Sequence, residues 1–265
     1  MPDRPRLPKV ADDDYDGRPR RRPVAARLSR RTVAFVALIA VAGGLAACGG
    51  SEQEQRKAFI QFLQTRIVDK PGIAIPRPTA EEKIAFGRYA ADYDVVLNFA
   101  GSADPVTAYR KFNYSLPRMD TAQNMLAQRA ENRLVGRRIR AVLKNCYDRA
   151  AEAQEARAGL KLPDDLKSVY NAAFDKVITT PVEDLKKIAP IAQKLAKVAA
   201  DLGDYLYIHP DKVLANGNNF QIADAATHDS LVALTDELNA NRKLFFAEQA
   251  RLQPIFQASD PLREP

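Results

Sequence analysis

The chain has few of the residues that usually carry chemistry in proteins. Among its 265 residues there are two cysteines, two histidines and no tryptophan. With so few nitrogen and sulfur ligands, a transition-metal site of ordinary composition is not expected. Neither the phosphate-binding loop G-x-x-x-x-G-K-[S/T] nor the nucleophile elbow G-x-S-x-G occurs. The sequence therefore predicts no catalytic residues, no metal and no cofactor, and we expect the protein not to be an enzyme.

A hydrophobic run long enough to cross a membrane is also missing. The longest apolar stretch, Val33–Ala42, would cover about 15 Å as a helix, about half of a ~30 Å hydrocarbon core. It follows a cluster of arginines and leads into Leu-Ala-Ala-Cys at 45–48. This layout is typical of a secretory signal peptide, and its last four residues match the lipobox of bacterial lipoproteins. We therefore predict cleavage between Ala47 and Cys48 and lipidation of the Cys48 thiol.

The predicted signal divides the chain into four parts. Residues 1–47 are the leader and lipoprotein signal peptide, residues 48–52 a lipidated tether, residues 53–258 a single helical domain and residues 259–265 a disordered tail. Within the leader, residues 1–23 are rich in Pro, Arg and Asp and lack the apolar residues of a core. They are either a disordered extension or the result of a start codon placed too early.

Lipidation predicts the location of the protein. Each buried methylene adds ~0.8 kcal/mol of membrane affinity, so the several acyl chains of a mature lipoprotein would hold Cys48 permanently on a bilayer. We expect a lipid-anchored protein of the bacterial cell envelope that faces the periplasm. Gly49 follows the cysteine, where enterobacterial lipoproteins retained at the inner membrane have aspartate. The glycine therefore favours the outer membrane over the inner membrane.

The basic charge lies largely outside the predicted domain. The whole chain has a net charge of +7, but residues 1–47 hold ten Lys or Arg and five Asp or Glu. Residues 48–265 then hold 30 basic and 28 acidic residues, a net charge of +2. A domain that is nearly neutral lacks the electrostatic footprint of a nucleic-acid-binding protein. We expect the membrane, through the anchor at Cys48, and an envelope protein as partners, and no nucleic acid.

Helix start signals predict the fold of the domain. TAEE at 79–82 and TPVE at 180–183 match the capping box, and Asp104-Pro105 matches a cap followed by proline in the first turn. Asn216-Gly217, flanked by apolar residues, suits a tight hairpin turn. The expected helices cover 53–68, about 80–100, a segment from 105, 118–157 (as one helix or two in near-continuation), 166–178, 180–207 with a kink at Pro190, and 225–256. We therefore predict an all-α fold, a bundle or elongated array of about five to six helices with one small β-hairpin near 213–222.

Five blocks of sequence carry a resemblance to a known family. They are QRKAFIQFLQ (55–64), FGRYAADY (86–93), DDLKSVYNAAFDKVITTP (164–181), GDYLY (203–207) and VLANG (213–217). In these blocks and in their order the chain resembles the YiaF-type family of bacterial lipoproteins, from Cys48 to near the C-terminus. The resemblance implies the lipid anchor and a domain without an assigned function, so no catalytic or binding residue carries over. The chain departs from the enterobacterial type in its long leader, its lack of tryptophan and its more basic central helix.

One basic stripe is a candidate contact surface. In the predicted helix over 118–157, basic residues recur at steps of three and four, which places them on one face. The stripe consists of Arg129, Arg133, Arg137, Arg140 and Lys144. It is either a solvated helix face, as charge runs usually are, or a contact for an anionic surface. That surface would be phospholipid headgroups or an acidic partner in the envelope.

Other candidate residues have structural interpretations. The carboxylate pairs Glu81-Glu82, Asp164-Asp165 and Glu183-Asp184 lie at expected helix starts, where they cap free amides. His228-Asp229-Ser230 has the residue types of a hydrolase triad, but neighbours on one helix do not face each other. Cys146 is interpreted as a buried, small apolar residue, with a reactive or intermolecularly paired thiol as the alternative.

Two functional hypotheses follow from these observations. The first is a membrane-anchored envelope lipoprotein whose helical domain docks on a partner. The second is a binding module that holds a small apolar or lipidic ligand between its helices. Aromatic pairs at or near helical spacing are expected to fill the core: Phe59 with Phe62, Tyr89 with Tyr93, and Phe245 with Phe246. The first hypothesis is preferred because long helices with polar faces offer a surface more plainly than a cavity.

Overall fold

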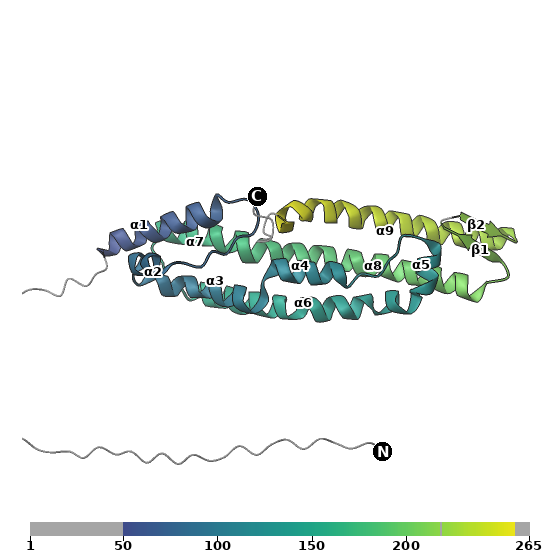
Figure 1. Cartoon of the computed structure of the whole chain (residues 1–265), viewed down its shortest axis with the longest axis horizontal. Coiled ribbons are helices and arrows are strands. Elements are labelled where there is room, and N and C mark those ends of the chain that lie inside the picture. Colours follow the sequence, from purple (N-terminus) through teal and green to yellow (C-terminus); the bar gives the residue numbers. More distant parts are fainter. Residues whose placement is uncertain (1–49, 218, 258–265) are drawn as a thin grey trace, which may run out of the picture. The chain divides into compact units, whose positions relative to one another are not determined.

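The structure, a computed structural model, describes residues 50–217 and 219–257 (Figure 1). The predicted leader and the predicted lipidation site at Ala47 and Cys48 lie outside the described residues, as does the predicted tail at 259–265. The described residues are helical apart from short connections and one two-stranded hairpin, which confirms the all-α prediction. They belong to one compact unit. None of the helices in the described ranges is long and apolar enough to cross a membrane.

The elements follow one another in a simple order. The helices are α1 Glu52–Leu63, α2 Ala80–Phe86, α3 Tyr89–Ala103, α4 Pro105–Tyr114, α5 Ala122–Ala127, α6 Arg129–Ala158, α7 Asp164–Phe174, α8 Thr180–Ile208 and α9 Ala225–Gln257. Two short π-helical segments continue the chain after α1 and after α7, namely η1 Gln64–Val68 and η2 Asp175–Thr179. Strands β1 Val213–Asn216 and β2 Asn219–Ile222 pair antiparallel, with Val213 opposite Ile222.

Helix α8 is the central helix of the bundle that it forms with α4, α5, α6 and α9. It runs between α6 and α9 and also packs against α4 and α5 (Figure 1). Leu185, Ala192 and Ala199 are fully buried, and buried side chains occur along almost the whole helix. A helix that is apolar on most of its sides is stable only when other elements surround it. The amphipathic helices around α8 provide that cover.

An aromatic cluster joins the first three helices to α7. The ring of Phe59 in α1 lies 5.2 Å from that of Phe86, 6.1 Å from that of Tyr93 and 6.4 Å from that of Tyr170, measured between centroids. The buried hydroxyl of Tyr170 donates to the carbonyl oxygen of Asp92 at 2.8 Å, so its polar group is satisfied. The prediction that the first two aromatic pairs fill the core is confirmed.

The helix starts confirm one capping box and correct the other. Thr79 Oγ1 accepts from the backbone N–H of Glu82 at 3.1 Å, and the Glu82 carboxylate accepts from the N–H of Thr79 at 2.8 Å. The expected cap at Thr180 is wrong, because the chain passes from α7 through η2 into α8 without a break. Thr179 already has helical dihedral angles, with φ −63° and ψ −56°, and makes no side-chain cap.

The hairpin is confirmed and one aromatic residue is corrected. Gly217 has φ +64°, the positive value for which the Asn216-Gly217 turn was predicted. Phe245 is buried, but Phe246 is 55% exposed, so its assignment to the core is wrong. The buried face of α9 passes through Leu238, Phe245 and Leu252, seven residues apart. Phe246 is rotated by about 100° from that face and points away from it.

Two helical glycines give a matched test of how closely the helices pack. Alanine is favoured over glycine inside a helix by about 1 kcal/mol. At Gly203 in α8, an added Cβ would come within 2.4 Å of the Met125 carbonyl oxygen in α5. At Gly136 in α6 the nearest atom, Gln193 Oε1, would be 3.6 Å away, an ordinary contact. We predict that Gly203→Ala lowers the free energy of unfolding by about 1–3 kcal/mol, and that Gly136→Ala raises it by up to about 1 kcal/mol.

Denaturant unfolding of both variants measures these changes. Both substitutions replace glycine by alanine inside a helix, so the gain from helix propensity is the same in both variants. The difference between their free energies of unfolding therefore measures the effect of the close approach of α5 to α8. Equal effects at the two positions would contradict that approach.

Candidate anion-binding groove

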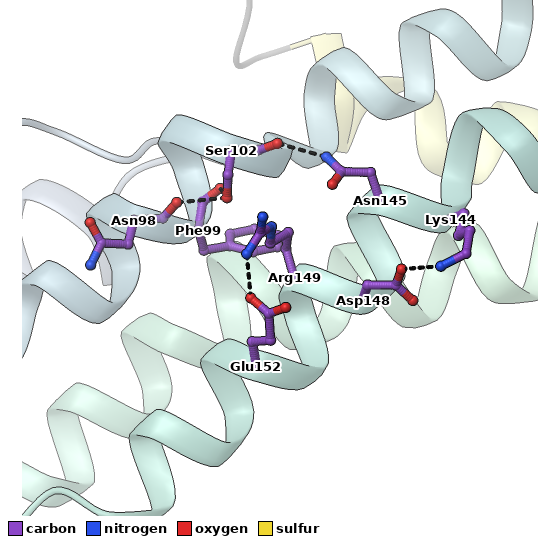
Figure 2. A network of polar contacts seen from close by, with 8 residues as sticks. All are labelled: Asn98, Phe99, Ser102, Lys144, Asn145, Asp148, Arg149 and Glu152. Atoms are coloured by element: carbon purple, nitrogen blue, oxygen red, sulfur yellow. Dashed lines mark hydrogen bonds and ion pairs between the residues drawn. The ribbon is translucent and has the colours of Figure 1, made fainter.

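Ion pairs divide the predicted basic stripe on α6 into neutralised and free charges. Arg129 and Arg133 both face Asp204 of α8, with Arg129 Nε 3.8 Å from the carboxylate and Arg133 in a closer ion pair. Lys144 pairs with Asp148 one turn further along α6 (Figure 2). Arg129 and Arg133 therefore share the single carboxylate of Asp204, and Lys144 is balanced by Asp148. The middle of the stripe remains.

The two arginines in the middle of the stripe have no such partner in the part of the chain that the structure describes. No carboxylate among the described residues forms an ion pair with Arg137 or Arg140. Both line a groove of about 520 Å³ between α6 and α8. Like charges at a spacing of three residues disfavour a helix by about 0.2–0.5 kcal/mol. An anion in the groove would remove this repulsion.

The α8 side of the groove is also basic, but its charges are paired. Lys197 donates to Asp201 at 2.6 Å, and this hydrogen bond raises the pKa of Lys197, so the ammonium stays protonated. Lys194 forms an ion pair with Glu237 of α9. Among the described residues, these pairings leave the groove with an excess of positive charge, carried mainly by Arg137 and Arg140, in a domain whose predicted net charge is only +2.

A buried amide in the same groove has no hydrogen-bond partner. Asn132 lines the groove and is 2% exposed. Neither its side-chain oxygen nor its side-chain nitrogen is bonded to any described residue. A buried polar group without a partner costs about 1–3 kcal/mol, so a water, an ion or a ligand that bonds to Asn132 would be stabilising. Sequence reasoning missed Asn132, because a polar residue in an arginine-rich helix looks like part of its solvated face.

The carboxylate pairs have structural roles, one of which differs from the prediction. Glu82 completes the capping box of α2, and Asp165, in the first turn of α7, pairs with Arg56 at 3.3 Å. Asp184 is not a cap, since it lies inside the continuous helix and is 2% exposed. Its Oδ1 accepts from Arg251 Nη2 of α9 at 2.7 Å. The hydrogen bonds that Arg251 donates to Glu248 and Asp184 raise the pKa of Arg251. The bond to Asp184 joins α9 to α8.

The residues of a hydrolase triad are not assembled. His228 Nδ1 lies 3.4 Å from Asp229 Oδ1 at an exposed position, and the Ser230 hydroxyl donates to the carbonyl oxygen of Ala226 at 3.0 Å. The serine is thus bonded to its own helix and not to the histidine. Within residues 50–217 and 219–257, no group of three or more His, Cys, Asp or Glu side chains is placed to hold a metal ion.

Cys146 is buried, as predicted. It is 2% exposed, and its thiol donates to the carbonyl oxygen of Ala103 at 3.6 Å. The neighbouring Asn145 donates to the carbonyl oxygen of Ser102 at 2.7 Å, which fixes this part of α6 against the end of α3 (Figure 2). Burial raises the pKa of Cys146 to about 11. The thiol is therefore protonated at neutral pH and is a poor nucleophile.

One pocket has mainly apolar walls. It encloses about 430 Å³ between the segment that follows α4 and helices α8 and α9. Leu116, Leu195 and Phe246 are among its lining residues. At its edge Arg242 donates to the carbonyl oxygen of Met119 at 2.6 Å. This pocket is better suited to an apolar ligand than the groove between α6 and α8.

Comparisons with known proteins place the chain beside relatives without an assigned activity. The model of a family described as "Protein of unknown function (DUF3053)" matches residues 36–253. The chain is 29% identical over 208 residues to the uncharacterized protein YiaF of Escherichia coli K12, across 77% of this chain and 88% of that protein. The uncharacterized protein YiaF of Shigella flexneri matches with the same identity and coverage. No solved structure shows significant similarity.

The raised pKa of Cys146 predicts that its thiol reacts slowly with disulfide reagents. In a chain that begins at Ser51, Cys146 is the sole cysteine. A shift of the pKa from 9.0 to about 11 lowers the thiolate fraction near pH 8 about 100-fold. We expect an aromatic disulfide reagent to label the folded protein at least 100-fold more slowly than the same chain in denaturant. Labelling at similar rates would show that Cys146 is accessible and reactive.

Proposed function

We propose that this chain, which belongs to the DUF3053 family of proteins of unknown function, is a lipid-anchored protein of the bacterial cell envelope. We further propose that its helical domain binds anionic groups through the groove between α6 and α8. The proposed role is binding and not catalysis. Its anchor is Cys48, and its proposed membrane partner is a bilayer that contains anionic phospholipid, with the outer membrane favoured.

The unpaired charge of Arg137 and Arg140 is the observation that carries the proposal. A basic residue close to an anionic membrane contributes about 1 kcal/mol, so two together would contribute about 2 kcal/mol, or about 30-fold in affinity. Such a contact is weak for a free protein. It becomes effective when a lipid holds the domain at the same membrane, because the second contact is then intramolecular.

The position of the anchor limits how the domain could meet a membrane. Helix α1 begins at Glu52, capped by Ser51, four residues after Cys48. Four extended residues span at most about 14 Å, so the start of α1 would stay near the bilayer. From Arg137 to the end of α6 at Ala158, beside α7, the helix rises about 32 Å. Anchor and groove can therefore meet one bilayer only if α6 lies along its surface.

The apolar pocket beside α9 supports a second candidate function. Phe246 is half exposed and lines this pocket together with the buried Leu195. A domain that binds a small apolar or lipidic ligand would use this site and would not depend on charge. The experiments below separate it from the first proposal.

The anchor is tested by metabolic labelling. We predict that radiolabelled palmitate enters the wild-type protein and the Cys146→Ala variant, but not the Cys48→Ala variant. Cys146→Ala is the matched control because it removes the other cysteine of the chain. Equal labelling of the Cys48→Ala variant would disprove lipidation at this residue.

The groove is tested by vesicle binding. A chain that begins at Ser51 contains every described helix and lacks the basic leader. We predict that it binds phosphatidylcholine vesicles more tightly as phosphatidylglycerol is added, and less tightly as salt is added. The double variant Arg137→Gln/Arg140→Gln should bind about 10- to 30-fold more weakly, at about 1 kcal/mol for each charge.

A second double variant controls for the loss of charge. Lys83 of α2 and Lys167 of α7 are exposed and lie outside the groove. Lys83→Gln/Lys167→Gln also removes two positive charges, and it should change binding less than threefold. If both double variants bind equally, the groove is not the contact. Binding that is insensitive to salt and to both arginines would favour the apolar pocket.

A further inference from the structure

The groove is lined by uncharged polar side chains as well as by positive charges. Asn132, Gly136 and Arg140 follow one another at steps of four residues, so they lie in one row along α6. Gly136 leaves a gap in the middle of the row. A Cβ at Gly136 would be 3.6 Å from Oε1 of Gln193 and 3.7 Å from Nη1 of Arg140. The side chains of Arg140 and Gln193 therefore border this gap, and Asn132 lies one helical turn before Gly136 in the same row.

To bond to the buried amide of Asn132, a ligand must insert a polar group into the groove, which a flat charged surface cannot do. Asn132 is 2% exposed, so a group that bonds to it must enter the groove. Arg137 and Arg140 attract anions over a distance of about 8–10 Å at moderate salt, but Asn132 acts only at hydrogen-bond distance. The two features are independent of each other, and both favour an anion that carries several acceptor oxygens.

The donors in the groove suit a phosphate group. Guanidinium groups bind phosphate through paired N–H donors, and amide groups of Asn and Gln add further donors. A phosphate group has enough oxygen atoms to accept from both arginines and from Asn132 at once. A carboxylate has two oxygen atoms and one negative charge, so it would leave part of this set unsatisfied.

We infer that the groove between α6 and α8 is a binding site for a phosphate-bearing ligand, with Arg137 and Arg140 balancing its charge and Asn132 bonding to an oxygen atom at the base of the groove. This inference rests on the proposed function in one respect, since both require the groove to attract anions. The phosphate belongs to a lipid headgroup or to a soluble phosphate ester, and the two sources share the same chemistry.

The test separates short-range recognition from charge. Asn132→Leu removes the amide and leaves the net charge unchanged. Because it replaces an unpartnered polar group by an apolar one of similar size, the variant should melt at the same temperature as the wild type or higher. Titration of the chain from Ser51 with glycerol 3-phosphate, followed by calorimetry, should show saturable binding. Asn132→Leu should weaken this binding at least tenfold. It should weaken binding to phosphatidylglycerol vesicles as well if the phosphate is that of a lipid headgroup, and change vesicle binding less than twofold if it is that of a soluble ester.

Two further variants complete the experiment. Arg137→Gln/Arg140→Gln should weaken both glycerol 3-phosphate and vesicle binding. If Asn132→Leu does not fold, Asn132→Asp keeps the shape of the side chain and places a carboxylate against the ligand. It should likewise weaken glycerol 3-phosphate binding at least tenfold.

The outcomes distinguish this inference from the proposed function. If glycerol 3-phosphate does not bind, or binds equally to the wild type and the Asn132 variant, the inference is wrong, although arginine-dependent vesicle binding would still support the proposed function. If glycerol 3-phosphate binding depends on Asn132 while vesicle binding ignores both arginines, the inference holds and the membrane contact fails. If both the inference and the proposed function hold, a competition experiment identifies the source of the phosphate. Displacement of the protein from vesicles by glycerol 3-phosphate identifies a lipid headgroup, and binding of glycerol 3-phosphate without displacement identifies a soluble ester.

Discussion

The burial of α8 is the constraint on which the rest of the fold depends. Small residues along this helix, such as Ala192, Ala199 and Gly203, let neighbouring helices approach closely, and at Gly203 the carbonyl oxygen of Met125 occupies the space of a side chain. The pairing of buried Asp184 with Arg251 then holds α9 against one side of α8. Helix α6 covers another side, and the groove lies along this contact. The candidate site is therefore a consequence of how α8 is covered.

The continuity of α7 with α8 joins the aromatic cluster to this central helix. In η2, the ammonium group of Lys176 donates to the carbonyl oxygens of Ile67 and Val68 at 3.0 and 2.8 Å. It thereby caps the end of η1 and ties the first helix to the long helical segment. Three of the five sequence blocks that resemble the YiaF-type family supply this region, namely 55–64, 86–93 and 164–181. The resemblance thus reports the packing of the scaffold, and the groove lies outside all three blocks.

Features set by a few adjacent residues could be predicted from the sequence. The capping box at Thr79 and the turn at Gly217 depend on local hydrogen bonds and dihedral angles, and both are present. The capping-box pattern at Thr180 gave a wrong prediction. The π-helical segment η2 ends at Thr179, and the hydrogen-bond pattern changes there from π-helical to α-helical. Pro181, which has no backbone N–H, lies at this change of pattern. A proline that usually marks a helix start is tolerated there inside a continuous helix.

The candidate site could be predicted only in part, for the same physical reason. Periodicity placed five basic residues on one face of α6, but their partners are distant in sequence, and Arg133 meets Asp204 across 71 positions. Only the packing of α6 on α8 decides which charges are neutralised and which amide is buried. A solvated face accounts for exposed arginines without partners, but it does not account for Asn132, which is buried and has no hydrogen-bond partner among the described residues. Because salt screens two charges beyond about 8–10 Å, the groove acts on groups that are already close, and a lipid anchor at Cys48 would provide that proximity.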